Sequence, residues 1–194
     1  MVTSNKNIEL PFSISNSVNH GKFPQKTPPR ASAVCLLFRR DQSGHTHAIL
    51  TKRSTQVSSH KGQISLPGGH YESSDENLEY TALRETEEEL GIPIHSIEVQ
   101  SHLPKIHGLD GRSIFPIVAT TECSLEAINP SSDEVDKVLH VPWQCLTRAN
   151  VDKFTFVMFG IRRMSYLFKF EEHNIWGITA NILYRANITG CDPT

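Results

Sequence analysis

Three glutamates near the middle of the chain have the spacing of side chains that share one face of a helix. Glu85, Glu88 and Glu89 occupy positions i, i+3 and i+4 of the segment RETEEELG, so their carboxylates would lie together if the segment is helical. Like charges at this spacing destabilise a helix by roughly 0.2–0.5 kcal/mol per pair, and the helix dipole disfavours anions at its C-terminal end. A divalent cation would offset both effects. Glu87 points nearly opposite and is expected to be a solvated charge.

A glycine turn immediately precedes the acidic segment. Gly68 and Gly69 of LPGG allow the backbone to approach a ligand or an ion without obstruction by side chains. Hard cations such as Mg²⁺ and Mn²⁺ bind carboxylate oxygens, backbone carbonyls and water, and they also bind the phosphates of a substrate. A run of glutamates can equally be a wet helix surface. The residue types alone therefore indicate metal-assisted phosphate chemistry and nothing more specific.

A helix must position these acids, and the sequence predicts one over residues 73–90. Ser73 and Glu76 have the spacing of a capping box, and Gly91 followed by Pro93 supplies the stop. The positions at helical spacing that should face the core are Leu78, Ala82, Leu83, Thr86 and Leu90.

Short runs rich in β-branched and aromatic residues predict the strands. ASAVCLLFRR and HAILTKR, separated by DQSGHT, indicate a hairpin, and QISLPGG ends a third short run. Further strands are expected in SIEVQSHL, SIFPIVAT, KVLHVPW, FTFVMF and SYLFKF. A second helix is expected over EEHNIWGITANILYRANITG, with Trp176 in the core. This order of elements predicts an α/β fold with a mixed β-sheet between helices.

Length and charge exclude several classes of protein. The 194 residues suggest one domain over 31–190, after an N-terminal arm or leader over 1–30. A net charge of −2 gives no basic footprint for nucleic acid, and no stretch approaches the roughly 18 apolar residues that cross a bilayer. The four cysteines have no paired spacing, which favours a reduced, intracellular protein. The sequence leaves open a homodimer, and it leaves open the cytoplasm, mitochondrion or peroxisome as the compartment.

The segment GGHYESSDENLEYTALRETEEELGI, residues 68–92, resembles the Nudix box, G-x(5)-E-x(7)-R-E-U-x-E-E-x-G-U, in which U is apolar. Counting back from Arg84 places the first acid at Glu76, and the later fixed positions fall on Glu85, Glu88, Glu89, Gly91 and Ile92. Two features depart from the pattern. Six residues separate Gly69 from Glu76, and Thr86 occupies an apolar position. A one-residue insertion in a loop costs little.

The resemblance implies a Nudix α/β/α sandwich that hydrolyses a diphosphate linked to another moiety. Glu85, Glu88 and Glu89, with the Gly69 carbonyl, would hold Mg²⁺ or Mn²⁺. Such an ion polarises phosphorus–oxygen bonds and lowers the pKa of the attacking water. Gly68 and Gly91 would be structural glycines of the motif.

The resemblance also implies roles for three further groups. Arg84 would brace the motif by pairing with a nearby acid, for which Glu76 is the expected partner. The catalytic base would be either Glu85 or a glutamate from a late loop. Glu134, in the polar stretch NPSSDEVDKVL, is the candidate for the late-loop base or a further metal ligand. An ordinary loop acid is the alternative interpretation of Glu134.

The sequence upstream of the box resembles a motif of coenzyme A diphosphatases, L-L-T-x-R-[SA]-x(3)-R-x(3)-G-x(3)-F-P-G-G. In LTKRSTQVSSHKGQISLPGG, residues 50–69, the positions that match are Thr51, Arg53, Ser54, Gly62, Pro67, Gly68 and Gly69. Three positions differ: Ile49, Ser58 and Leu66 replace a leucine, an arginine and a phenylalanine. The segments HKGQIS and IWGITANIL also resemble members of this subfamily.

This second resemblance implies hydrolysis of coenzyme A or its thioesters to 3′,5′-ADP and 4′-phosphopantetheine or its acylated form. Arg53, His60 and Lys61 are the expected substrate contacts. The alternatives are a structural arginine at a strand end and a solvated loop lysine, and the loss of an arginine at Ser58 leaves substrate choice open. The rival functions are hydrolysis of another nucleoside diphosphate such as ADP-ribose, and a catalytically silent Nudix binding domain. The intact glutamate triad argues against silence.

Overall fold

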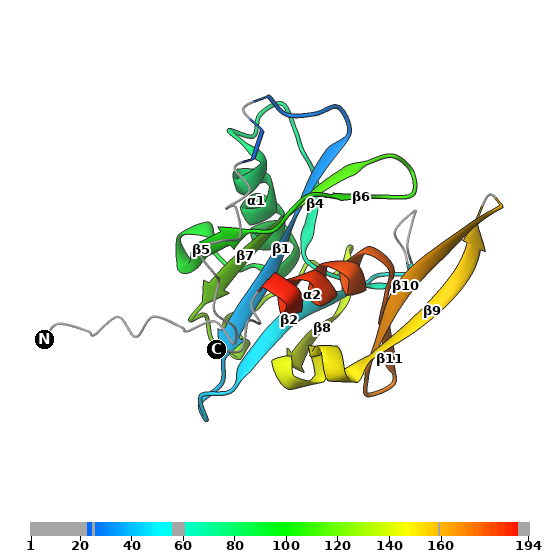
Figure 1. Cartoon of the computed structure of the whole chain (residues 1–194). Helices are drawn as coiled ribbons and strands as arrows, with labels where there is room; N and C mark the ends of the chain where they lie inside the picture. The colour runs from blue at the N-terminus through cyan, green and yellow to red at the C-terminus, as the bar shows by residue number, and fades with distance from the viewer. Residues whose placement is uncertain (1–22, 25, 56–60, 159, 190–194) are drawn as a thin grey trace, which may run out of the picture.

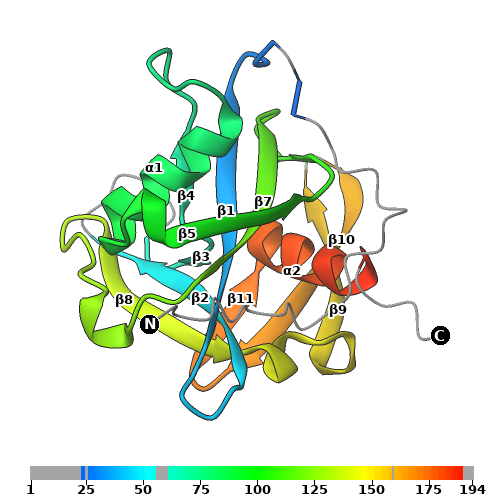
Figure 2. The same ribbon diagram turned by 90° about the vertical axis from the view of Figure 1, so that its left-hand side faces the viewer.

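An eight-stranded mixed sheet forms the centre of the molecule, with helix α1 (Leu78–Leu90) on one face and helix α2 (Gly177–Thr189) on the other. The computed structural model describes residues 23–24, 26–55, 61–158 and 160–189. Figure 1 shows the whole chain, and in Figure 2 α1 lies in front of the sheet with α2 behind it. The expected α/β architecture, with a mixed sheet between helices, is therefore confirmed.

The strands fall into two sheets. The large sheet consists of β1 (Ala31–Arg40), β2 (Thr46–Arg53), β3 (Ile64–Ser65), β4 (Gly68–His70), β5 (Ile97–His102), β6 (Ile106–His107), β7 (Ser113–Thr121) and β8 (Val135–Pro142). The small sheet consists of β9 (Val151–Met158), β10 (Ile161–Phe170) and β11 (His173–Trp176). Four 3₁₀ turns connect these elements, at Ile94–Ser96, Leu125–Ala127, Trp143–Leu146 and Arg148–Asn150.

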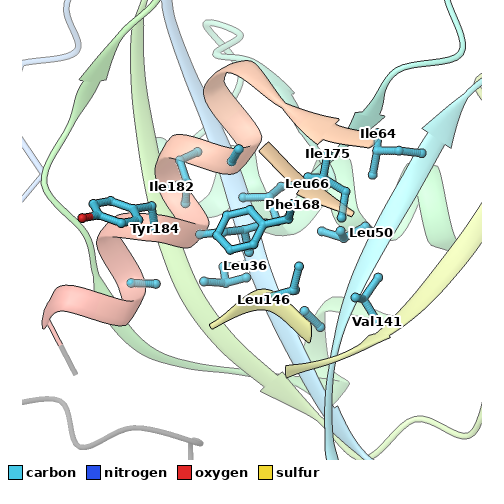
Figure 3. Packing of buried hydrophobic residues seen from close by; sticks show 14 of the residues in the cluster. Leu36, Leu50, Ile64, Leu66, Val141, Leu146, Phe168, Ile175, Ile182 and Tyr184 are labelled. Atoms are coloured by element: carbon cyan, nitrogen blue, oxygen red, sulfur yellow. The ribbon is translucent and has the colours of Figure 1, made fainter. Parts of the chain in front are cut away.

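Strand β1 organises the large sheet. It pairs with β7 in parallel and with β2 and β4 in antiparallel fashion. Alternate side chains of a strand point to opposite faces, and the two hydrophobic cores follow this rule. Ala33, Cys35 and Leu37 pack on the side of α1, whereas Leu36 and Phe38 pack on the side of α2, against Phe168 of β10 and Ile182 of α2 (Figure 3).

Helix α1 begins later than the sequence predicts. Its first residue is Leu78, and the Asn77 side chain caps it by accepting a hydrogen bond of 2.8 Å from the Tyr80 amide. The expected capping box of Ser73 and Glu76 is therefore wrong, because these residues lie in the loop before the helix. Gly91 ends the helix as predicted, in the left-handed conformation with φ of 67°.

The buried side of α1 agrees closely with the predicted one. Leu78, Ala82, Thr86 and Leu90 are buried, and Leu83 is partly buried. Thr86 is accommodated because its hydroxyl donates a hydrogen bond of 2.6 Å to the Ala82 carbonyl within the same helix.

The C-terminal helix is shorter than predicted. The segment His173–Trp176 is strand β11, paired with β10, and α2 begins only at Gly177. The placement of Trp176 in the core is also wrong, since 48% of this residue is exposed. Among the residues that the structure describes, no helix is long and apolar enough to cross a membrane.

Candidate active site

The glycine strand β4 lies directly under the acidic helix. Gly69 is paired with Ala33 of β1, and a Cβ added at Gly69 would collide with the carboxyl group of Glu85. Gly68 has φ of +148°, and its Cβ would collide with the β1 backbone at Ala33 and Val34. Gly68 therefore requires glycine, and the absence of a side chain at Gly69 allows the Glu85 carboxylate to lie against the backbone of β4.

The three glutamates have very different environments. Glu89 is buried with 3% of its surface exposed, Glu85 is partly buried, and Glu88 is exposed. Arg84 donates to Glu88 at 2.9 Å and contacts Glu85 at 3.0 Å. Among the described residues, the ligand atoms of these three glutamates do not form a group within 4.8 Å of one another. Arg84 thus bridges Glu85 and Glu88, whereas Glu89 is buried beneath them.

Glu89 is a buried carboxylate with little compensation. Its pKa is raised to about 8, mainly by burial and in part by the charges of Glu85 and Glu134, while Arg53 and the Gly68 backbone oppose the shift. The Arg53 guanidinium lies 3.9 Å from Oε1, and Oε2 is buried with no hydrogen-bond partner among the described residues. Burial also raises the pKa of Glu85, and Arg84 opposes that shift. The part of these shifts that comes from neighbouring carboxylates reflects a negative potential, which a bound cation would offset.

Arg84 pairs with Asp75 instead of the expected Glu76. Arg84 Nε donates to Asp75 Oδ1 at 2.9 Å and its Nη2 donates to Oδ2 at 3.2 Å. Asp75 is buried and also accepts hydrogen bonds from the Thr81 hydroxyl and the Glu72 amide. Glu76 is exposed. The brace of the loop before α1 is therefore the Asp75–Arg84 pair.

Sequence reasoning missed Asp75, although a signal for it was present. Five residues separate Gly69 from Asp75, which is the spacing of the box between its glycine and its first acid. Counting back from Arg84 gave Glu76 instead, because the extra residue was assigned to the loop before the acid. In the structure the extra residue of the box follows the acid and lies between Asp75 and the helix.

A loop that is attached to the end of α1 brings Glu134 near the site. The Ser131 amide donates to the Glu89 carbonyl at 3.0 Å, and the Glu134 amide donates to the Ser131 carbonyl at 3.2 Å. The Ser54 amide, just after β2, donates to the Glu134 carbonyl at 2.8 Å. Glu134 is exposed, and its charge raises the pKa of both Glu85 and Glu89. Its position is therefore compatible with the proposed role as base or ligand.

The expected substrate contacts divide into three cases. Arg53, at the end of β2, faces Glu89, and its Nε is buried without a hydrogen-bond partner among the described residues. Lys61 is exposed in the turn before β3, where the structure shows no contact with the acids. His60, like Ser58, lies outside the described residues.

The residues present fit a divalent cation. The donor set consists of hard oxygens, which Mg²⁺ and Mn²⁺ prefer, and the unpaired Oε2 of Glu89 is a buried ligand atom without a protein partner. Glu85 lies against the same glycine strand. Glu88 is exposed and contacts Arg84 through Oε2 at 2.9 Å, which leaves its other oxygen as a further carboxylate ligand atom.

Comparison with known proteins identifies relatives of the whole region. A family model described as the NUDIX domain matches residues 28–160. The chloroplastic Nudix hydrolase 22 of Arabidopsis thaliana is 31% identical over 186 residues, which cover 90% of this chain and 61% of that protein. This chain thus spans less than two thirds of the plant protein. The uncharacterized Nudix hydrolase NudL of Salmonella paratyphi B is 33% identical over 155 residues, covering 79% of each chain.

Among solved structures, a Nudix hydrolase from M. smegmatis, RenU, is similar with 22% identity and a TM-score of 0.49. The matched region covers 59% of this chain and 71% of that protein.

Proposed function

The chain belongs to the Nudix hydrolase family, and we propose that it hydrolyses the diphosphate of coenzyme A or of its thioesters with the aid of Mg²⁺ or Mn²⁺. The products would be 3′,5′-ADP and 4′-phosphopantetheine or its acylated form. One observation carries the proposal: Arg53 of the upstream motif lies 3.9 Å from Glu89 of the Nudix box. The motif that resembles coenzyme A diphosphatases and the acidic helix thus contribute to one site.

The residues of the chain would divide the work as follows. Glu85 and Glu89, with the Gly69 carbonyl and a reoriented Glu88, would hold the cation. That ion supplies stabilisation of the charge that develops on the diphosphate and lowers the pKa of the attacking water. Arg53 would bind the diphosphate, because a guanidinium matches phosphate oxygens in a bidentate geometry.

The base would be Glu134, a carboxylate that is exposed and comes from a loop fixed at both Ser54 and Ser131. Glu85 is less suited to this role, since it is already engaged by Arg84 at 3.0 Å. A Glu134→Gln variant should therefore lower kcat and alter the dependence of kcat on pH, with little effect on binding of the cation. A pH profile that is the same in wild type and variant would assign the base elsewhere.

A substrate panel tests the function directly. The purified protein is incubated with Mg²⁺ and coenzyme A, an acyl thioester of coenzyme A, ADP-ribose or a dinucleoside polyphosphate, and products are separated by chromatography. Coenzyme A or its thioester should give the highest kcat/KM. A higher kcat/KM for ADP-ribose would contradict the proposal that coenzyme A is the substrate. Absence of turnover with every compound would favour a catalytically silent binding domain.

A further inference from the structure

The outer half of the β9–β10 hairpin exposes a group of apolar side chains. Phe154, Val157, Ile161 and Met164 are between 38% and 66% exposed. Strand β11 pairs with β10 over residues 167–170, so the hairpin nearer the turn is a two-stranded ribbon in the part of the chain that the structure describes. We call residues 153–158 and 160–166 the outer ribbon. A two-stranded ribbon is marginally stable in water, and exposed apolar surface marks sites of interaction.

The exposed apolar side chains lie on both faces of the outer ribbon. Cross-strand partners of an antiparallel pair share a face, and successive residues of a strand alternate between faces. The register of β9 with β10 therefore places Val157 and Met164 on one face and Phe154 and Ile161 on the other. A folded protein docked against one face would leave the other in water. A lipid headgroup layer that the end of the ribbon enters would surround both.

The charge of the outer ribbon is opposite in sign to that of the whole chain. The ribbon contains Lys153, Arg162 and Arg163 and no acidic residue, whereas the chain has a net charge of −2. Both arginines are exposed. Two copies of this ribbon brought together would repel each other, and an anionic surface would attract it. Each Lys or Arg held near an anionic membrane strengthens binding about fivefold.

We propose that the outer ribbon docks the protein on an anionic lipid surface. Val157 and Ile161, near the turn, enter the boundary between headgroups and acyl chains, which apolar faces of peripheral proteins reach to a depth of about 5–10 Å. Arg162 and Arg163 keep their guanidinium groups at the level of the lipid phosphates, because long basic side chains hold their charge at the interface. The hairpin extends away from α1 and the large sheet (Figure 1), so α1 stays clear of the lipid.

Co-sedimentation of the full chain with lipid vesicles tests the proposal. Vesicles of phosphatidylcholine mixed with phosphatidylserine should retain the protein, and vesicles of phosphatidylcholine alone should retain much less, because they lack the net negative charge. Raising the ionic strength from about 0.1 M to about 1 M should weaken the binding, because it shortens the Debye length from about 10 Å to about 3 Å.

Two kinds of variant separate charge from apolar contact. Arg162→Gln and Arg163→Gln should each weaken binding to the anionic vesicles about fivefold, whereas Lys26→Gln, an exposed lysine before β1, should not. Met164→Ser should weaken binding about tenfold by removing an apolar contact. Leu125→Ser, at an exposed leucine outside the hairpin, is the matched control. Each variant should keep the unfolding midpoint of wild type, because the substituted side chain is largely in water.

A tryptophan near the turn reports contact with lipid directly. Val157→Trp keeps this position apolar, and its emission should shift to shorter wavelength when anionic vesicles are added. Wild type provides the background, since both of its tryptophans, Trp143 and Trp176, lie outside the outer ribbon.

The possible outcomes are distinct. Failure of wild type to sediment with anionic vesicles, equal retention by neutral and anionic vesicles, or equal binding by wild type and Met164→Ser would each overturn the proposal. A dimer in sedimentation equilibrium that Met164→Ser abolishes, together with no binding to vesicles, would assign the ribbon to a second copy of the chain instead. None of these measurements uses turnover, so failure of the proposed function would leave this inference standing.

Discussion

The glycine strand β4 with helix α1 and the β9–β10 hairpin differ in how far their β-strands are packed against the rest of the molecule. Strand β1, which supports β4, has seven residues of its ten buried, and α1 packs on it. Strand β9 has none of its eight residues buried, and the hairpin extends away from α1 and the large sheet in Figure 1. The acids, which need a fixed geometry, lie on α1. This helix packs on the large sheet, and a hydrophobic core covers each face of that sheet.

Within the described residues, the contacts of the hairpin with the rest of the molecule lie at its base. Phe168 is buried beside Ile175, and the Tyr166 ring stacks on Tyr184 of α2 with centroids 3.9 Å apart. Toward the turn, Val157 and Met164 are 66% and 60% exposed. Substitutions in the two regions should therefore have very different consequences.

The largest effect is expected at the buried acid. Glu89→Gln should lower kcat on the order of 10³-fold, because it removes a carboxylate ligand of the cation that stabilises the developing charge. It should also remove the increase in thermal stability that Mg²⁺ or Mn²⁺ gives to wild type. The fold should persist, since the amide has the same shape and avoids a buried charge. Glu87→Gln is the matched control on the exposed side of α1, and a similar loss there would contradict the assignment.

The next effect concerns the brace. Asp75→Asn should destabilise the protein by about 1–3 kcal/mol, because the amide cannot accept every hydrogen bond that this buried carboxylate takes from Arg84 and Thr81. Arg84 keeps its contacts with Glu85 and Glu88 in the variant. Glu76→Gln, one residue later and exposed, should change the free energy of unfolding by less than about 0.5 kcal/mol. Denaturant titration of both variants measures the difference. Equal effects would mean that Arg84 does not depend on Asp75.

The same pair predicts an acid-dependent loss of stability. Burial raises the pKa of Asp75, but hydrogen bonds from Arg84, the Glu72 amide and Thr81 lower it by more, so it lies below its ordinary value. A carboxyl with a depressed folded pKa contributes stability above its unfolded pKa of about 3.9 and loses it as the pH falls through the folded pKa. Unfolding midpoints measured from neutral pH to below pH ~4 should therefore fall less in Asp75→Asn than in wild type.

The smallest effect is expected on the hairpin. Val157→Thr should change the free energy of unfolding by less than about 0.5 kcal/mol, because the side chain is already in water. Val118→Thr on β7, where the valine is fully buried, should cost about 1–3 kcal/mol by burying a hydroxyl. If the two variants were equally destabilising, the hairpin would be packed more tightly than its exposure indicates.

Local patterns were sufficient for the strands and the buried side of the helix. Strand β1 spans the predicted run Ala31–Arg40, because its alternating positions are buried on both faces and its residues are nearly all apolar. The start of α1 could not be predicted in this way. The run SSDEN contains several residues that can cap a helix. Asn77 is the cap, whereas the Asp75 carboxylate accepts hydrogen bonds from Arg84 and Thr81.

The remaining errors also depend on contacts distant in sequence. HNIW has a helix-like pattern, but β10 pairs with it as a strand, which leaves Trp176 exposed. In the site, the acids and Arg53 could be predicted from the sequence, whereas the bridge that Arg84 forms between Glu85 and Glu88 could be seen only in three dimensions.

The attachment of the 129–134 loop to the end of α1 limits how this scaffold can be re-engineered. The loop supplies the hydrogen bonds that the last helical carbonyls lack, through the Asn129 amide to Leu90 and the Ser131 amide to Glu89. A chimaera that exchanges this loop for one of different length would therefore also release the C-terminal turn of α1, where Glu89 sits. Loop grafts intended to alter substrate range should preserve the register of Asn129 and Ser131. They should vary only residues whose amides donate no hydrogen bond to α1.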